Sequence, residues 1–94
     1  MSVVNILIGQ LVTSSAGRDQ ADVYLVMGIK HNKYLLLVNG RERKVENPKQ
    51  KNIRHVNVLE AIALDVAEKL RSGMKISDEE VRQAIKVLHK PDNL

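Results

Sequence analysis

Six basic side chains stand close together in the segment 41–54, and they are the strongest chemical signal in the chain. Lysine and arginine combine positive charge with several hydrogen-bond donors, which suits contacts to phosphate groups. Pro48 prevents a helix from running through the segment, so we expect the cations that follow it to be displayed on a loop. The expected phosphate-contacting residues are Arg41, Arg43, Lys44, Lys49, Lys51 and Arg54.

A second short segment, Ser14–Asp19, is made of small and polar residues that favour a tight turn. Gly17 tolerates a positive φ angle, and the Asp19 carboxylate can accept hydrogen bonds from nearby amides. We expect Gly17 and Asp19 to build the turn. The planar guanidinium of Arg18 has no such structural role and suits a phosphate or a base edge, so Arg18 joins the expected contacts.

The chain offers little for catalysis. It has no cysteine, and its three histidines (His31, His55 and His89) do not have the spacing of a metal site. Ser14 and Ser15 lack the Gly-x-Ser-x-Gly setting of a serine nucleophile. We therefore expect no enzyme activity, no metal and no cofactor.

Charge is distributed unevenly along the 94 residues. Residues 1–56 contain nine Lys or Arg and four Asp or Glu, whereas residues 57–94 contain six and seven. The net charge of +4 thus arises in the first part of the chain, as in proteins that bind polyanions. No run is long and apolar enough for a signal peptide or a membrane span, which favours a cytoplasmic protein.

Five short segments have the composition of β-strands. The segment 22–30 alternates apolar residues at period two, and the pair His31-Asn32 predicts a tight hairpin into the next strand. Asn39 and Gly40 predict a further turn, since both residues tolerate positive φ. The expected strands are 8–13, 22–30, 33–38, 43–46 and 53–56.

Helical patterns follow. Asn57 and Glu60 have the spacing of a helix cap, and Gly73 is a natural helix end. The expected apolar stripe of this first helix is Leu59, Ile62, Ala63, Val66 and Leu70.

Ser77 and Glu80 form a Ser-x-x-Glu capping box at the start of a second helix. Its expected buried face is Val81, Ala84, Ile85 and Leu88.

Together these patterns predict a mainly β fold with α: a small five-stranded barrel over residues 1–56 and a helical C-terminal extension over 57–94 that packs on the barrel.

The segment from Gly9-Gln10-Leu11-Val12 through Gly17-Arg18-Asp19 to Met27-Gly28-Ile29 resembles a KOW motif. Asn39-Gly40-Arg41, Pro48-Lys49-Gln50-Lys51-Asn52 and His55 extend the resemblance to KOW-domain proteins of Gram-positive bacteria, which are related to a large-subunit ribosomal protein family of archaea and eukaryotes. The resemblance spans roughly residues 8–56. It implies an SH3-like barrel that binds RNA, commonly ribosomal RNA, with Gly17 as the motif glycine.

The sequence is therefore compatible with two classes of function. In the first, the protein binds structured RNA through the basic loops, is associated with the ribosome and works in translation. The chain has only two tyrosines and no Phe or Trp, so few side chains could stack on bases. This scarcity favours recognition of the RNA backbone and shape. In the second, the barrel is a protein-protein interaction module, because SH3-like barrels serve many functions. We expect no membrane partner in either case.

Overall fold

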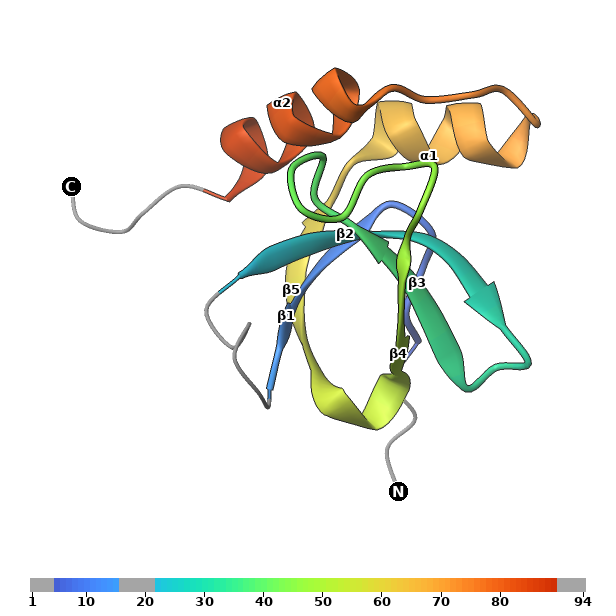
Figure 1. The fold of residues 1–94 in the computed structure, drawn as a ribbon, viewed down its shortest axis with the longest axis vertical. Coiled ribbons are helices and arrows are strands. Elements are labelled where there is room, and N and C mark those ends of the chain that lie inside the picture. Colours follow the sequence, from blue (N-terminus) through green and yellow to red (C-terminus); the bar gives the residue numbers. More distant parts are fainter. Residues whose placement is uncertain (1–4, 16–21, 90–94) are drawn as a thin grey trace, which may run out of the picture.

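The structure is a computed structural model, and it describes residues 5–15 and 22–89. Five antiparallel strands form one curved sheet in the order β4-β3-β2-β1-β5, and two helices lie across one end of it (Figure 1). The fifth strand returns to pair with the first. This arrangement confirms the expected mainly β fold with α, a small five-stranded, barrel-like domain followed by two helices. The strands are β1 (Gln10–Ser14), β2 (Val23–Lys30), β3 (Tyr34–Val38), β4 (Lys49–Asn52) and β5 (Val56–Ile62).

The inner, concave face of the sheet encloses a first apolar cluster, which we call the barrel core. Tyr24 and Val26 of β2 point into it, together with side chains from the neighbouring strands. Its remaining buried members are Ile6, Val12, Leu35 and Leu37.

The outer face of the same strands carries a second cluster, the helix-side core. Leu25 of β2 belongs to it, although its neighbours Tyr24 and Val26 belong to the barrel core. Strand residues alternate between the two faces, so a strand buried on both sides reads as a continuous apolar run, as β2 and β3 do. The other buried members of the helix-side core are Leu11, Val38, Ala63, Val66, Ile76 and Val81.

The hairpin between β2 and β3 has the expected tight turn. His31 and Asn32 both have positive φ angles, 55° and 53°, and the Lys33 amide donates to the Lys30 carbonyl at 3.0 Å. Two consecutive residues of positive φ match the twist of the strands that they join. The register of β2 against β3 shifts between Val26 and Gly28.

The expected strand over 43–46 is wrong, because these residues lie in the irregular connection after β3. The strand forms instead from Lys49–Asn52, whose polar composition gives no strand signal. This segment is extended because it pairs with β3, with Leu35 opposite Lys51 and Leu37 opposite Lys49.

The expected last strand over 53–56 and the expected helix start at Asn57 are also wrong. Ile53–His55 form one turn of 3-10 helix, η1, and β5 then runs to Ile62. Asn57 pairs with Thr13 of β1 instead of capping a helix. Pairing along β1 outweighs the weak local helical signal.

The first helix, α1 (Leu64–Arg71), ends just before Gly73, the expected helix-stop residue. Gly73 has φ 80°, its amide donates to the Leu70 carbonyl at 3.1 Å, and the Met74 amide donates to the Lys69 carbonyl at 2.9 Å. These two bonds satisfy carbonyls that the end of a helix leaves free. Of the expected apolar stripe, Leu59 and Ile62 lie on β5, whereas Val66 is buried on α1.

The second helix, α2 (Asp78–Leu88), begins with the predicted capping box. The Glu80 amide donates to Ser77 Oγ at 3.1 Å, and the Ser77 amide donates to Glu80 Oε1 at 2.9 Å. Val81 is fully buried, and burial of such a side chain contributes about 2 kcal/mol. Leu88, expected on the buried face, is exposed instead.

Candidate nucleic-acid interface

The loop between β3 and β4 is folded around the side chain of Asn39, which is buried. Its Oδ1 accepts hydrogen bonds from the amides of Arg41 at 2.9 Å and Arg43 at 3.0 Å. Its Nδ2 donates to Glu42 Oε1 at 3.2 Å. Gly40 has φ 76°, a conformation that favours glycine. Asn39 and Gly40 therefore build the turn that displays the first basic residues of segment 41–54.

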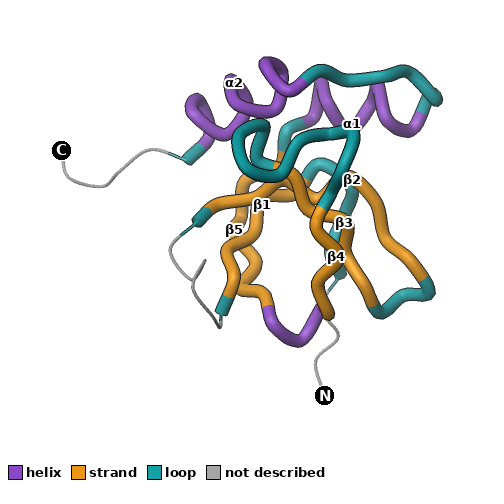
Figure 2. Tube along the Cα trace, viewed as in Figure 1, coloured by secondary structure: helices purple, strands orange, loops and turns teal. Residues whose placement is uncertain are grey.

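The same loop is attached to α2 at two points. The Val45 amide donates to Asp78 Oδ1 at 2.8 Å, and Arg82 Nη1 donates to the Gly40 carbonyl at 2.6 Å. Figure 2 shows the loop lying directly beneath α2. A loop held in this way loses less conformational entropy when it binds a partner.

The cations of this loop form one basic group, which we call the loop group. Arg41 and Lys44 are exposed and Arg43 is half-buried. Arg41 lines a depression of about 460 Å³ together with Arg82 and Lys86 of α2. The acidic residues Asp22 and Glu42 also line it, so the charge there is mixed.

Arg82 and Lys86 are basic residues that were not predicted from the sequence to belong to the interface. They lie about forty residues further along the chain, on a helix whose charges fit an ordinary solvated face. Only the docking of the loop on α2 brings them beside Arg41.

Lys49 and Lys51 lie on β4 and not on a loop as expected. They stand opposite Leu37 and Leu35, and so they share the face of the sheet that encloses the barrel core. Both lysines are half-buried. In such a position the aliphatic stem of a lysine covers apolar surface.

Arg54 is exposed on η1, at the end of the barrel opposite the helices (Figure 1). Asn52 caps this turn by accepting the Arg54 amide at 2.9 Å. The Ile53 amide donates to the Lys33 carbonyl at 2.9 Å, which ties η1 to the β2–β3 hairpin. Lys33 is exposed there, with its Nζ 5.5 Å from the centre of the Tyr34 ring. Lys33 and Arg54 form a second basic group, the hairpin group.

The expected contact residues are thus divided between two ends of the molecule. Arg41, Arg43 and Lys44 lie beside the helices and Arg54 lies at the far end, while Lys49 and Lys51 stand between them along β4. Because β4 is at the end of the strand order, the six residues follow one margin of the sheet. The expected turn residues Gly17 and Asp19 and the expected contact Arg18 lie outside the described residues.

Over residues 5–15 and 22–89, no three His, Cys, Asp or Glu side chains come close enough together to hold a metal ion. In the same ranges, no helix is long and apolar enough to cross a membrane. What this margin of the sheet offers a ligand is fixed positive charge on an ordered backbone.

Comparison with known proteins gives no match, either to a protein-family model or to a curated protein.

Proposed function

We propose that this protein binds structured RNA, and ribosomal RNA in particular, through the basic margin from Arg41 to Arg54. The observation that carries the proposal is the series of six cations along β4 and its two flanking turns. Such a series can follow a phosphate backbone, because each cation that meets a phosphate releases a condensed counterion. The proposal places the protein in the cytoplasm, in association with the ribosome.

The mode of recognition follows from the side chains at this margin. Tyr24 is buried in the barrel core, and Tyr34 is half-buried beneath Lys33. Neither tyrosine offers an open platform on which a base could stack. The protein therefore reads the backbone and shape of folded RNA, with the loop group and the hairpin group in contact with separate phosphates.

A charge-matched pair of double variants tests the proposal. Lys44→Gln with Arg54→Gln removes two exposed cations from the margin, whereas Arg71→Gln with Lys75→Gln removes two exposed cations beyond it. Fluorescence anisotropy would measure binding to a labelled ribosomal RNA hairpin over a range of KCl concentrations. We expect the first variant to weaken binding and to reduce the slope of log affinity against log salt by about 2.

The second variant is expected to keep the slope of the unmodified protein. Equal losses in the two variants would mean that only net charge attracts RNA, and the proposed margin would be wrong. Affinity that does not change with salt would remove the phosphate mechanism altogether.

A further inference from the structure

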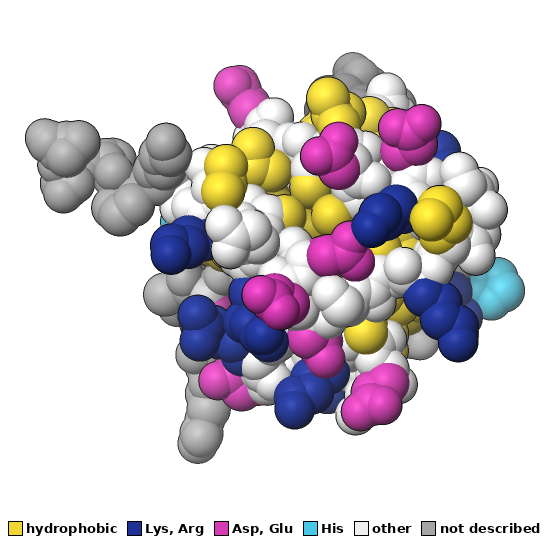
Figure 3. Space-filling model, turned by 90° about the horizontal axis from the view of Figure 1, so that it is seen from above, with side chains coloured by type: hydrophobic (Ala, Val, Ile, Leu, Met, Phe, Trp, Pro, Cys, Tyr) yellow, Lys and Arg dark blue, Asp and Glu magenta, His cyan; other side chains and the backbone are white. Residues whose placement is uncertain are grey.

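The two helices and the last residue of β5, Ile62, line an apolar groove of about 880 Å³. Figure 3 views the face of the molecule that carries the helices and shows apolar side chains gathered along it, with acidic and basic side chains among them. Ala63 and Val66 form part of the groove, so it is continuous with the helix-side core. Its most exposed apolar members are Leu64 at 68%, Met74 at 55%, Val87 at 52% and Leu88 at 38%.

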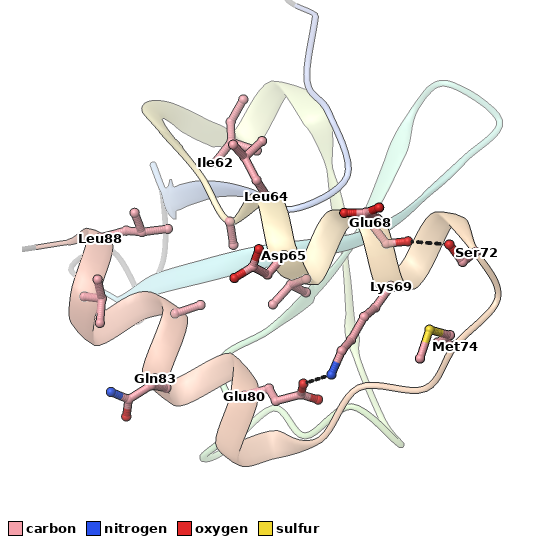
Figure 4. A pocket seen from close by; sticks show the side chains of 14 residues that line it. Ile62, Leu64, Asp65, Glu68, Lys69, Ser72, Met74, Glu80, Gln83 and Leu88 are labelled. Carbon is pink, nitrogen blue, oxygen red and sulfur yellow. Dashed lines mark hydrogen bonds and ion pairs between the residues drawn. The ribbon is translucent and has the colours of Figure 1, made fainter.

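The ionisable side chains that line this apolar groove carry a net negative charge. Four ionisable side chains line it, of which Asp65, Glu68 and Glu80 are acidic and Lys69 is basic. Lys69 pairs with Glu80 across the gap between the helices (Figure 4). Within the described residues, Asp65 and Glu68 form no ion pair. Two carboxylates on α1 thus remain available to a partner, in contrast to the basic margin of the sheet.

We propose that this groove binds an amphipathic helix of a partner protein whose apolar face is flanked by lysine or arginine. Helices bind in grooves through apolar side chains at positions i, i+3 or i+4, and i+7. The groove runs beside α2, whose 11 residues span about 16 Å, a length that fits two to three turns of a partner helix. Asp65 and Glu68, three residues apart on α1, would face the basic flank of that helix.

Charge complementarity favours this occupant over the others. A second copy of this chain, packed about a twofold axis, would bring the same acidic groove against itself. An RNA strand or an anionic membrane would meet carboxylates where it needs cations. The inference does not depend on RNA binding, since the groove shares none of its residues with the basic margin from Arg41 to Arg54.

Two synthetic 14-residue peptides test the proposal. Both have leucine at positions i, i+3, i+4 and i+7 on an alanine background, and they differ only in having lysine or glutamate beside the leucines. Titration into the full ¹⁵N-labelled chain would measure both affinities and map the binding site by NMR. We expect the lysine peptide to bind at least about tenfold more tightly and to shift the amide signals of α1 and α2.

Matched variants locate the contacts. Leu64→Gln should weaken binding of the lysine peptide at least about fivefold, whereas Leu7→Gln, which changes another exposed leucine outside the groove, should not. Asp65→Asn with Glu68→Gln should make the two peptides bind equally. The inference is overturned if neither peptide binds, if the unmodified chain does not distinguish them, or if the shifted signals lie outside the helices. Ultracentrifugation that shows a dimer sensitive to Leu64→Gln would replace the partner helix with a second copy.

Discussion

The first residue of α2, Asp78, holds the amide of Val45 at 2.8 Å, although 33 residues separate the two in the chain. Val45 also packs against the helix-side core. The basic loop is therefore part of the same packed unit as the helices, and its shape depends on them.

Asp78→Ala should destabilise the protein by about 1–2 kcal/mol, because it removes the acceptor of a half-buried amide and a carboxylate at a helix N-terminus. For a domain of this size the melting temperature should fall by about 4–16 °C. Glu79→Ala, which changes an exposed carboxylate in the same turn, should cost less than half as much. Thermal unfolding followed by circular dichroism distinguishes the two. Equal losses would mean that the charge at the helix end matters and the bond to Val45 does not.

Gly40→Ala should be more damaging than Gly73→Ala, even though both glycines have φ near 80°. A Cβ at Gly40 would lie 2.5 Å from the Asp78 carbonyl oxygen and 2.7 Å from Arg82 Cγ, whereas a Cβ at Gly73 would have nothing within 4 Å. We expect about 3 kcal/mol for the first, from backbone strain and steric conflict, and about 1 kcal/mol for the second, from strain alone. Urea unfolding measures both. Similar values would show that the loop can move away from α2 without cost.

Acid should weaken the contact between the two helices. A hydrogen bond from Lys69, followed by one from the Ser77 amide, lowers the pKa of Glu80 below its ordinary value of 4.5. A carboxylate with a lowered pKa in the folded state stabilises the protein above its unfolded pKa, and this contribution is lost as the pH falls through the folded value.

Glu80→Gln can keep the capping box but lacks the titrating charge. We expect the difference in melting temperature between the unmodified protein and this variant to be largest near pH 7 and to shrink steadily below pH 4.5. Melting curves from pH 7 to pH 3 provide the measurement. A difference that does not vary with pH would show that the ion pair with Lys69 contributes nothing to folding.

Sequence reasoning succeeded where the determinants are local. The capping box of Ser77 and Glu80 lies within four residues, and the turn at Gly73 needs only a residue that accepts positive φ. Both features follow from bonds between near neighbours in the chain.

Prediction from the sequence failed where pairing with a distant strand determines the conformation of a segment. Asn57 and Glu60 have the spacing of a helix cap, yet their segment pairs with β1, and Asn57 lies opposite Thr13. Lys49–Asn52 carries no apolar alternation, and only its pairing with β3 makes it a strand. The two basic residues of α2 beside Arg41 could not be found for the same reason, since their position depends on how the loop docks.

Strand β2 has one further consequence, which concerns how the chain folds. Its successive side chains Tyr24, Leu25 and Val26 enter the barrel core and the helix-side core in turn. A strand that serves as the common wall of two cores cannot lose its order on one side only. We therefore expect the barrel and the helices to unfold as one cooperative unit, so that a ligand bound to either of the two proposed surfaces would also stabilise the other surface.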